Sequence, residues 1–132
     1  MDKVAFGRKG ELFVLGELFK KGWQLSYNDT DILKQIDWIL EKNSKRISIQ
    51  IKTCSDNRLS FSMHTNKPYD FLIVTDLVDI WIVPSFTIEH INSINHKRKE
   101  LLCNKFELLE LDKEQTIKVL MDIGFRPSEI VT

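Results

Sequence analysis

The chain has 132 residues, of which 42% are hydrophobic and 29% are charged, and its formal net charge is zero. This composition predicts a folded protein with a hydrophobic core and argues against a disordered chain. No apolar run of about 18 residues is present, and the N-terminus lacks the apolar segment of a signal peptide, so we expect a cytoplasmic protein without a membrane segment. We expect one domain over residues 1–132.

The first half of the chain predicts one helix followed by three strands. Apolar periodicity predicts the helix at residues 5–21, and Gly22 is suited to end it. A short strand is expected at residues 23–27. Two further strands, at residues 35–41 and 46–53, flank the polar sequence KNSK and predict an antiparallel hairpin.

The second half predicts further strands and helices. We expect strands at residues 69–75 and 80–83 and a short strand at 59–63, followed by a helix at 88–103, a strand at 106–111 and a helix at 113–123. The fold class is therefore α/β, with a central mixed sheet that contains the hairpin and is flanked by helices. Its core is expected at residues 5–84, and residues 85–132 form a C-terminal helix, strand and helix elaboration.

The hydrophobic pattern fixes the register of the hairpin. A two-residue turn at Asn43 and Ser44 pairs Lys42 with Lys45 and, further along, Asp37 with Gln50. In that register the apolar residues of both strands share one face, whereas a slip of one residue separates them. The apolar face consists of Ile36, Trp38, Leu40, Ile47, Ile49 and Ile51. The opposite face gathers Asp37, Gln50 and Lys52.

A second carboxylate is expected to face the sheet from the first helix. Glu11 lies on the same helical stripe as Val14, Leu15 and Leu18. A carboxylate on a core-facing stripe is costly to bury unless it meets a cation, a hydrogen-bond donor or a metal ion. The alternative is that Glu11 lies at the edge of the stripe and stabilises the start of the helix.

These motifs, taken together, resemble the PD-(D/E)XK nuclease superfamily. The sequence places GRKGE (residues 7–11) on the first helix, then QIDW, then QIK (residues 50–52), and later YDFLIV and IWIVP. The match is similar to a small branch with Gln in place of the second acid, which includes intron-encoded homing endonucleases and relatives of archaeal Holliday-junction resolvases. It covers residues 6–84 and implies a restriction-endonuclease-like core.

The resemblance also implies an activity and a site. The activity is Mg²⁺-dependent hydrolysis of DNA phosphodiester bonds, with Mn²⁺ as a substitute ion, by a homodimer or larger assembly. Asp37 is implied as the central metal ligand, Glu11 and Gln50 as further ligands, and the Ile51 backbone carbonyl as another; Lys52 is implied to stabilise the transition state. Because Gln50 is neutral, we expect weaker metal binding than with Glu. Loop residues Asp29 and Asp31 are candidate compensating ligands or turn formers.

Several alternatives remain open. Lys97, Arg98 and Lys99 either contact phosphates or form a solvated helix end. His64 and His90 lack partners at zinc-ligand spacing, and the two cysteines are expected to be reduced and structural. The chain is either a metal-dependent DNA endonuclease or a catalytically inactive nuclease-fold module that binds nucleic acid or a protein.

Overall fold

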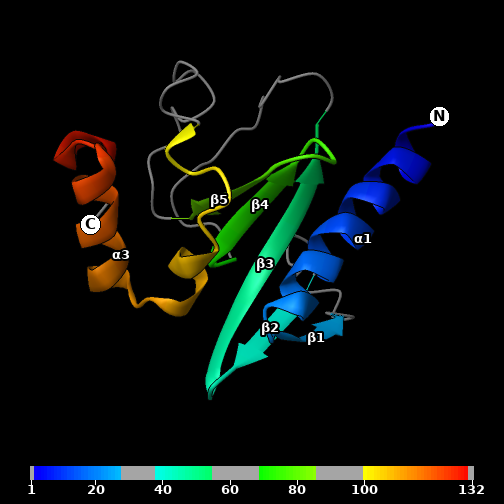
Figure 1. Cartoon of the computed structure of the whole chain (residues 1–132), viewed down its shortest axis with the longest axis horizontal. Helices are drawn as coiled ribbons and strands as arrows, with labels where there is room; N and C mark the ends of the chain where they lie inside the picture. The colour runs from blue at the N-terminus through cyan, green and yellow to red at the C-terminus, as the bar shows by residue number, and fades with distance from the viewer. Residues whose placement is uncertain (1, 28–37, 55–68, 86–99, 131–132) are drawn as a thin grey trace.

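The fold is a single mixed β-sheet flanked by helices, as the computed structural model in Figure 1 shows. It describes residues 2–27, 38–54, 69–85 and 100–130. The five strands lie in the order β1-β2-β3-β4-β5. Their bounds are Gln24–Tyr27 (β1), Trp38–Lys42 (β2), Lys45–Thr53 (β3), Phe71–Thr75 (β4) and Ile80–Pro84 (β5). The helices are α1 (Lys3–Lys20), the 3₁₀ helices η3 (Phe106–Glu110) and η4 (Pro127–Glu129), and α3 (Lys113–Ile123).

Helix α1 begins and ends at residues that suit a helix boundary. The Asp2 side chain accepts a hydrogen bond from the Ala5 N–H at 2.7 Å and so caps the first turn. Gly22 follows the helix with a φ of 92°, a left-handed conformation that glycine adopts without the cost of a side chain. The helix therefore lies close to the predicted range, with its start two residues earlier than residue 5.

The β2–β3 hairpin has the predicted register. Trp38 pairs with Ile49, Leu40 with Ile47, and Lys42 with Lys45. The two turn residues, Asn43 and Ser44, have φ angles of 51° and 67°, as a tight hairpin turn of this kind requires. Leu40 and Ile49 are fully buried, which explains why a one-residue slip would be costly.

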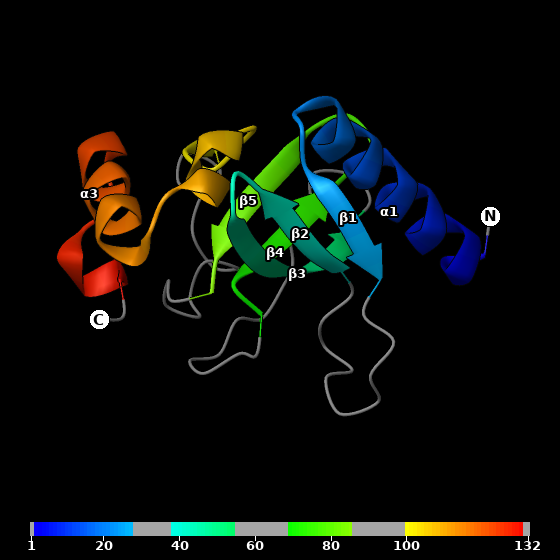
Figure 2. The same ribbon diagram turned by 90° about the horizontal axis from the view of Figure 1, so that it is seen from below.

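The rest of the sheet combines both strand directions. β3 runs parallel to β4, and β4 runs antiparallel to β5, so the predicted mixed sheet is confirmed. Seen from below in Figure 2, α1 and the turn of η3 lie on the same side of the sheet, and α3 lies at the end of the molecule opposite α1. No helix in the described segments is long and apolar enough to cross a membrane.

Alternation along β3 assigns its side chains to two faces. A Cβ atom added to Gly10 of α1 would overlap the Thr53 hydroxyl, so Thr53 faces α1, and Ile49 and Ile51 face the same way by period-two alternation. Gln50 and Lys52 therefore leave the strand on the face away from α1. On that face their partners in β4 are Leu72 and Val74, which are both buried.

The segment that follows β5 differs from the prediction in two ways. The expected strand at residues 106–111 is the 3₁₀ helix η3. Its backbone makes local bonds, since the Leu108 N–H donates to the Lys105 carbonyl at 3.1 Å and the Leu111 N–H donates to the Leu108 carbonyl at 3.3 Å. The expected helix at residues 88–103 lies mostly outside the described residues, and its predicted end is wrong, because Cys103 forms an antiparallel bridge with Trp81 of β5. The strand expected at residues 59–63 also lies outside the described residues.

Helix α3 has the predicted bounds, and its start is well capped. The Asp112 carboxylate accepts from the Gln115 N–H at 2.8 Å, and the Gln115 side chain accepts from the Asp112 N–H at 3.0 Å. This reciprocal capping box satisfies two backbone donors that the first turn leaves without helical partners. It also explains why the chain can turn directly from η3 into α3.

Candidate functional site

Gln50 and Lys52 emerge side by side from the same face of β3. Gln50 is half-buried and Lys52 is exposed. The neighbouring row on β4 is apolar and buried at Leu72 and Val74. A polar amide and an ammonium group thus border the apolar part of this sheet face, at the half of β3 nearest its C-terminal end.

Ser48 precedes Gln50 by two residues on the same face of β3, and it is hydrogen-bonded to Asp70. The Asp70 carboxylate accepts hydrogen bonds from the Ser48 N–H at 2.9 Å and from the Ser48 hydroxyl at 3.2 Å. The Asp70 N–H in turn donates to the Ser48 carbonyl at 2.9 Å. The side chain of Ser48 therefore has a structural role: it ties the start of β4 to the middle of β3. Tyr69, the residue before Asp70, is buried, and this burial raises the pKa of its hydroxyl.

Glu11 points toward the sheet, as its place on the α1 stripe predicts. Its Oε1 accepts a hydrogen bond from the Trp38 indole Nε1–H at 2.5 Å, and the contact is partly buried. The alternative role at the start of α1 belongs instead to Asp2, which caps the helix. Glu11 is thus supplied with a hydrogen-bond donor, which lowers the cost of keeping a carboxylate against the sheet.

The structure brings together only part of the predicted site. Gln50 and Lys52 share one face of β3, whereas Trp38, the partner of Ile49, holds Glu11 on the α1 side of the hairpin. Asp37, expected opposite Gln50, lies outside the described residues. So do the remaining candidates, which are Asp29, Asp31, His64, His90, Lys97, Arg98 and Lys99.

Two residues with defined contacts at this site, Trp38 and Asp70, were not assigned to the site from the sequence. Trp38 adjoins Asp37 and lies opposite Ile49, so its indole N–H was a donor within reach of a sheet-facing Glu11. Asp70 precedes the buried strand β4, where an exposed carboxylate is typical of an ordinary strand boundary. The sequence signals were weak: Trp38 adjoins Asp37, and Asp70 lies in the motif YDFLIV.

The donor set fits Mg²⁺ in kind. Mg²⁺ prefers the hard oxygen atoms of carboxylates, amides and backbone carbonyls, and Gln50 and Ile51 offer an amide and a carbonyl. Glu11 offers a carboxylate, but on the α1 side of the sheet, away from Gln50. The second Glu11 oxygen, Oε2, has no hydrogen-bond partner among the described residues. Within the described part of the chain, no three His, Cys, Asp or Glu side chains gather in a way that could hold an ion. A complete site therefore depends on Asp37.

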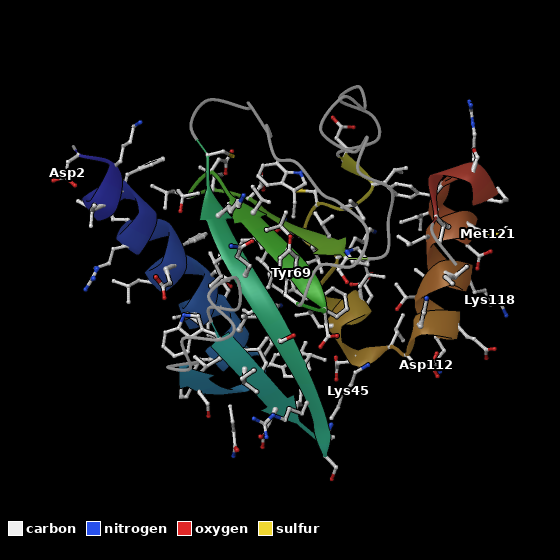
Figure 3. The ribbon with its side chains drawn as sticks, turned by 180° about the vertical axis from the view of Figure 1, so that it is seen from behind. Asp2, Lys45, Tyr69, Asp112, Lys118 and Met121 are labelled. Carbon is white, nitrogen blue, oxygen red and sulfur yellow. The ribbon has the colours of Figure 1, made fainter. Side chains whose placement is uncertain are left out.

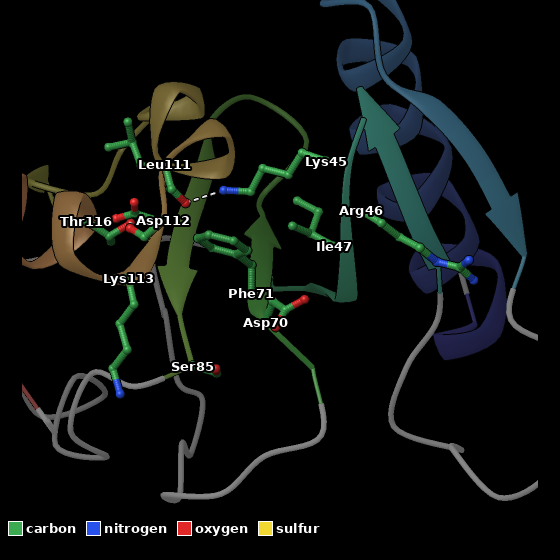
Figure 4. Close-up of a pocket in the computed structure, with 10 residues that line it drawn as sticks. All are labelled: Lys45, Arg46, Ile47, Asp70, Phe71, Ser85, Leu111, Asp112, Lys113 and Thr116. Carbon is green, nitrogen blue, oxygen red and sulfur yellow. Dashed lines mark hydrogen bonds between the residues drawn. The ribbon is translucent and has the colours of Figure 1, made fainter. Parts of the chain in front are cut away.

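A separate pocket lies at the other end of β3. Figure 4 shows its lining residues at the junction of β3, β4 and the start of α3. The pocket has a volume of about 480 Å³. Lys45 donates from its Nζ to the Leu111 carbonyl at its rim, and Phe71 forms part of its wall. Seen from behind in Figure 3, Lys45 and Asp112 mark this region. Among the described residues, the predicted site residues Glu11, Gln50, Ile51 and Lys52 do not line this pocket.

One comparison with known proteins, that with solved structures, bears on the fold. No family model and no curated protein matches the sequence. Among solved structures, the chain is similar to the bacterial homing endonuclease I-Ssp6803I, with a TM-score of 0.50 and 14% sequence identity. The similarity covers 64% of this chain and 70% of that protein. At this identity the likeness concerns the fold, and the chain accordingly has an α/β, nuclease-like fold.

Proposed function

We propose that this protein is a metal-dependent DNA endonuclease of the PD-(D/E)XK type. The observation that carries the proposal is that Gln50 and Lys52 lie next to each other on one face of β3, in a fold similar to that of a homing endonuclease. Asp37 is the residue expected to face Gln50, and the hairpin register that underlies this expectation holds over the described pairs from Lys42–Lys45 to Trp38–Ile49.

The proposed chemistry assigns each group a task. Asp37 and Gln50, with the Ile51 carbonyl, would hold Mg²⁺ or Mn²⁺. Glu11, which the resemblance implies as a further ligand, lies on the α1 side of the sheet, away from Gln50. When bound, the ion supplies Lewis-acid stabilisation of the charge on the phosphate and a more acidic water. Lys52 places a positive charge beside the scissile phosphate, where it stabilises the negative charge that develops in the transition state. Because one such site cuts one strand, a homodimer or larger assembly would cut both strands of a duplex.

A catalytically inactive module with the same fold is the alternative function. Two observations favour it: Gln50 is neutral, and one oxygen of Glu11 is already engaged by Trp38. Such a module would bind nucleic acid or a protein through this surface without needing an ion. The two functions make different predictions. The endonuclease cleaves DNA and requires Asp37 and Lys52 for it, whereas the inactive module does not cleave DNA.

Cleavage assays with matched variants test the proposal. Purified protein is incubated with plasmid, single-stranded and branched DNA in Mg²⁺, Mn²⁺ or EDTA. We expect metal-dependent cleavage that falls at least about 100-fold in Asp37→Ala and in Lys52→Ala, since each removes a group that acts on the charge of the transition state. Asp122→Ala and Lys118→Ala are the controls, because both residues are exposed on α3, and Figure 3 places Lys118 far from α1.

The metal response separates the roles of the two residues. Titration calorimetry should show weaker Mg²⁺ binding in Asp37→Ala, whereas Lys52→Ala should bind Mg²⁺ as well as the wild type or more tightly, because a cation is removed from beside the ion. Gln50→Glu should tighten metal binding by adding a charged ligand. Wild-type protein that cleaves no DNA form and binds no metal through Asp37 would favour the inactive module.

A further inference from the structure

The sheet face that carries Gln50 and Lys52 continues to the other end of β3. Period-two alternation along β3 puts Arg46 on this same face. Its cross-strand partner Glu41 points the same way, and so does Gln24 of β1, which pairs with Glu41. Arg46, Glu41 and Gln24 are all exposed. The β4 partners of Gln50 and Lys52 are buried, so the open part of this face runs along β3 from Lys52 to Arg46.

Arg46 is held only loosely at its end of the strand. Its Nη1 lies 3.8 Å from Oε1 of Glu41, which is longer than a hydrogen bond. The Arg46 side chain is 70% exposed and that of Glu41 is 50% exposed, and ion pairs as exposed as this one contribute little to stability. Figure 4 shows Arg46 extending away from Lys45 and Phe71. The guanidinium group is therefore accessible to a second anion.

We propose that Arg46 binds a phosphate of the same DNA strand whose scissile phosphate lies at Lys52, an inference that rests on the proposed function. Arg46 and Lys52 are six residues apart on one strand. This separation corresponds to about 20 Å, a length over which one strand of a duplex carries about six phosphates. One stretch of DNA backbone along β3 thus reaches both cations. Lys52 serves the reaction, and Arg46 anchors the strand beyond it through two parallel hydrogen bonds from its guanidinium group.

Glu41 opposes this contact and gives the proposal a sign. Its carboxylate competes with a phosphate for Arg46 and repels the DNA backbone. Removing Arg46 should therefore weaken DNA binding, whereas neutralising Glu41 should strengthen it. The competing explanation is a cross-strand ion pair that only supports the hairpin. In that case both substitutions lower the free energy of unfolding slightly, and neither changes the affinity for DNA.

DNA binding in EDTA tests the contact, because no metal-dependent cleavage interferes. The affinity for a labelled duplex is measured by fluorescence anisotropy between about 50 and 200 mM salt. Arg46→Ala should weaken binding at least about 10-fold at the lowest salt, as expected for the loss of a charged hydrogen bond. It should also reduce the log–log slope against salt by about 0.9. Lys118→Ala, which removes an exposed cation from α3, is the control.

Two further variants sharpen the result. Arg46→Lys keeps the charge and loses the planar fork, so it should keep the salt slope and lose part of the affinity. Glu41→Gln should raise the affinity by up to about 5-fold, the scale of one exposed ion pair. Asp122→Asn, which neutralises an exposed acid on α3, is its control. Urea denaturation of each variant verifies that the fold is intact. If Arg46→Ala and Glu41→Gln change the affinity in the same direction, or no more than the α3 controls do, the inference is overturned.

Failure of the inference can be told from failure of the proposed function. If wild-type protein cleaves DNA with a metal ion, but Arg46→Ala and Glu41→Gln bind DNA as the wild type does, the inference is wrong and the nuclease proposal stands. If the two variants shift DNA affinity in opposite directions but no DNA is cleaved, the anchor is supported and the protein is the inactive module. If wild-type protein neither binds nor cleaves DNA, both are wrong.

Discussion

Gly10 permits α1 to approach β3 more closely than any other residue would at that position. A Cβ atom at Gly10 would lie 2.8 Å from both Cβ and Cγ2 of Thr53 and would overlap its hydroxyl oxygen. Rotation of the Thr53 side chain cannot relieve the contact with its Cβ, which is fixed to the strand. We therefore expect Gly10→Ala to push α1 away from the sheet and destabilise the protein.

The magnitude follows from two opposing effects. Forcing one methyl group into a packed contact costs about 1 to 3 kcal/mol, while replacing glycine by alanine inside a helix returns about 1 kcal/mol. The net destabilisation expected for Gly10→Ala is then up to about 2 kcal/mol. Gly16 is the matched control, because a Cβ there meets nothing within 4 Å, so Gly16→Ala should stabilise the fold by about 0.5 to 1 kcal/mol.

Urea denaturation of the two variants measures the difference. The free energy of unfolding should fall in Gly10→Ala and rise in Gly16→Ala, with similar denaturant slopes. A Thr53→Gly background, which removes all three contacting atoms, should reduce the penalty of Gly10→Ala. If the two glycine variants change stability by the same amount and in the same direction, the close approach of α1 to Thr53 is refuted.

Three other predictions address separate features. Asp112→Ala should lower the free energy of unfolding by about 1 kcal/mol in urea titrations, because it removes the capping box of α3; an unchanged midpoint would contradict this. Burial, and next the charge of Asp79, raises the pKa of the Cys103 thiol, so less thiolate forms near pH 8 than in a free peptide. In a Cys54→Ser background, iodoacetamide should therefore label Cys103 slowly, and Asp79→Asn should speed labelling. Neutralising residues 97–99 should reduce the log–log slope of DNA affinity against salt by about 0.9 for each phosphate that these side chains neutralise; an unchanged slope would assign this run to a solvated surface.

The hairpin could be predicted because its pattern and its turn agree. Alternating isoleucines in β3 specify one buried face, and the Asn43–Ser44 turn fixes which residues face one another. The bounds of α3 were equally accessible, since Asp112 and Gln115 form a recognisable capping signal. Local chemistry determined both elements.

Contacts that join distant segments were harder to predict. The apolar residues Leu108 and Leu109 suit a strand or a helical turn, and their packing against the sheet decides in favour of η3. Helical periodicity predicted that Glu11 faces the sheet. It could not predict the hydrogen-bond partner Trp38, which lies 27 residues away in the sequence. The side chain of Glu11 contacts the side of β2 that faces α1, whereas Gln50 and Lys52 leave β3 on the opposite face. The structure therefore does not bring Glu11 together with these two residues.

The bridge between Trp81 and Cys103 has a consequence for how this sheet could be extended by another chain. The Ile82 N–H donates to the Leu102 carbonyl at 3.2 Å and the Asn104 N–H donates to the Ile80 carbonyl at 2.6 Å, so the outer edge of β5 is already paired. Among the described strands, this leaves β1 as the open edge, and it is only four residues long. As far as the described strands determine it, a partner strand would join the sheet along Gln24–Tyr27, which contacts α1.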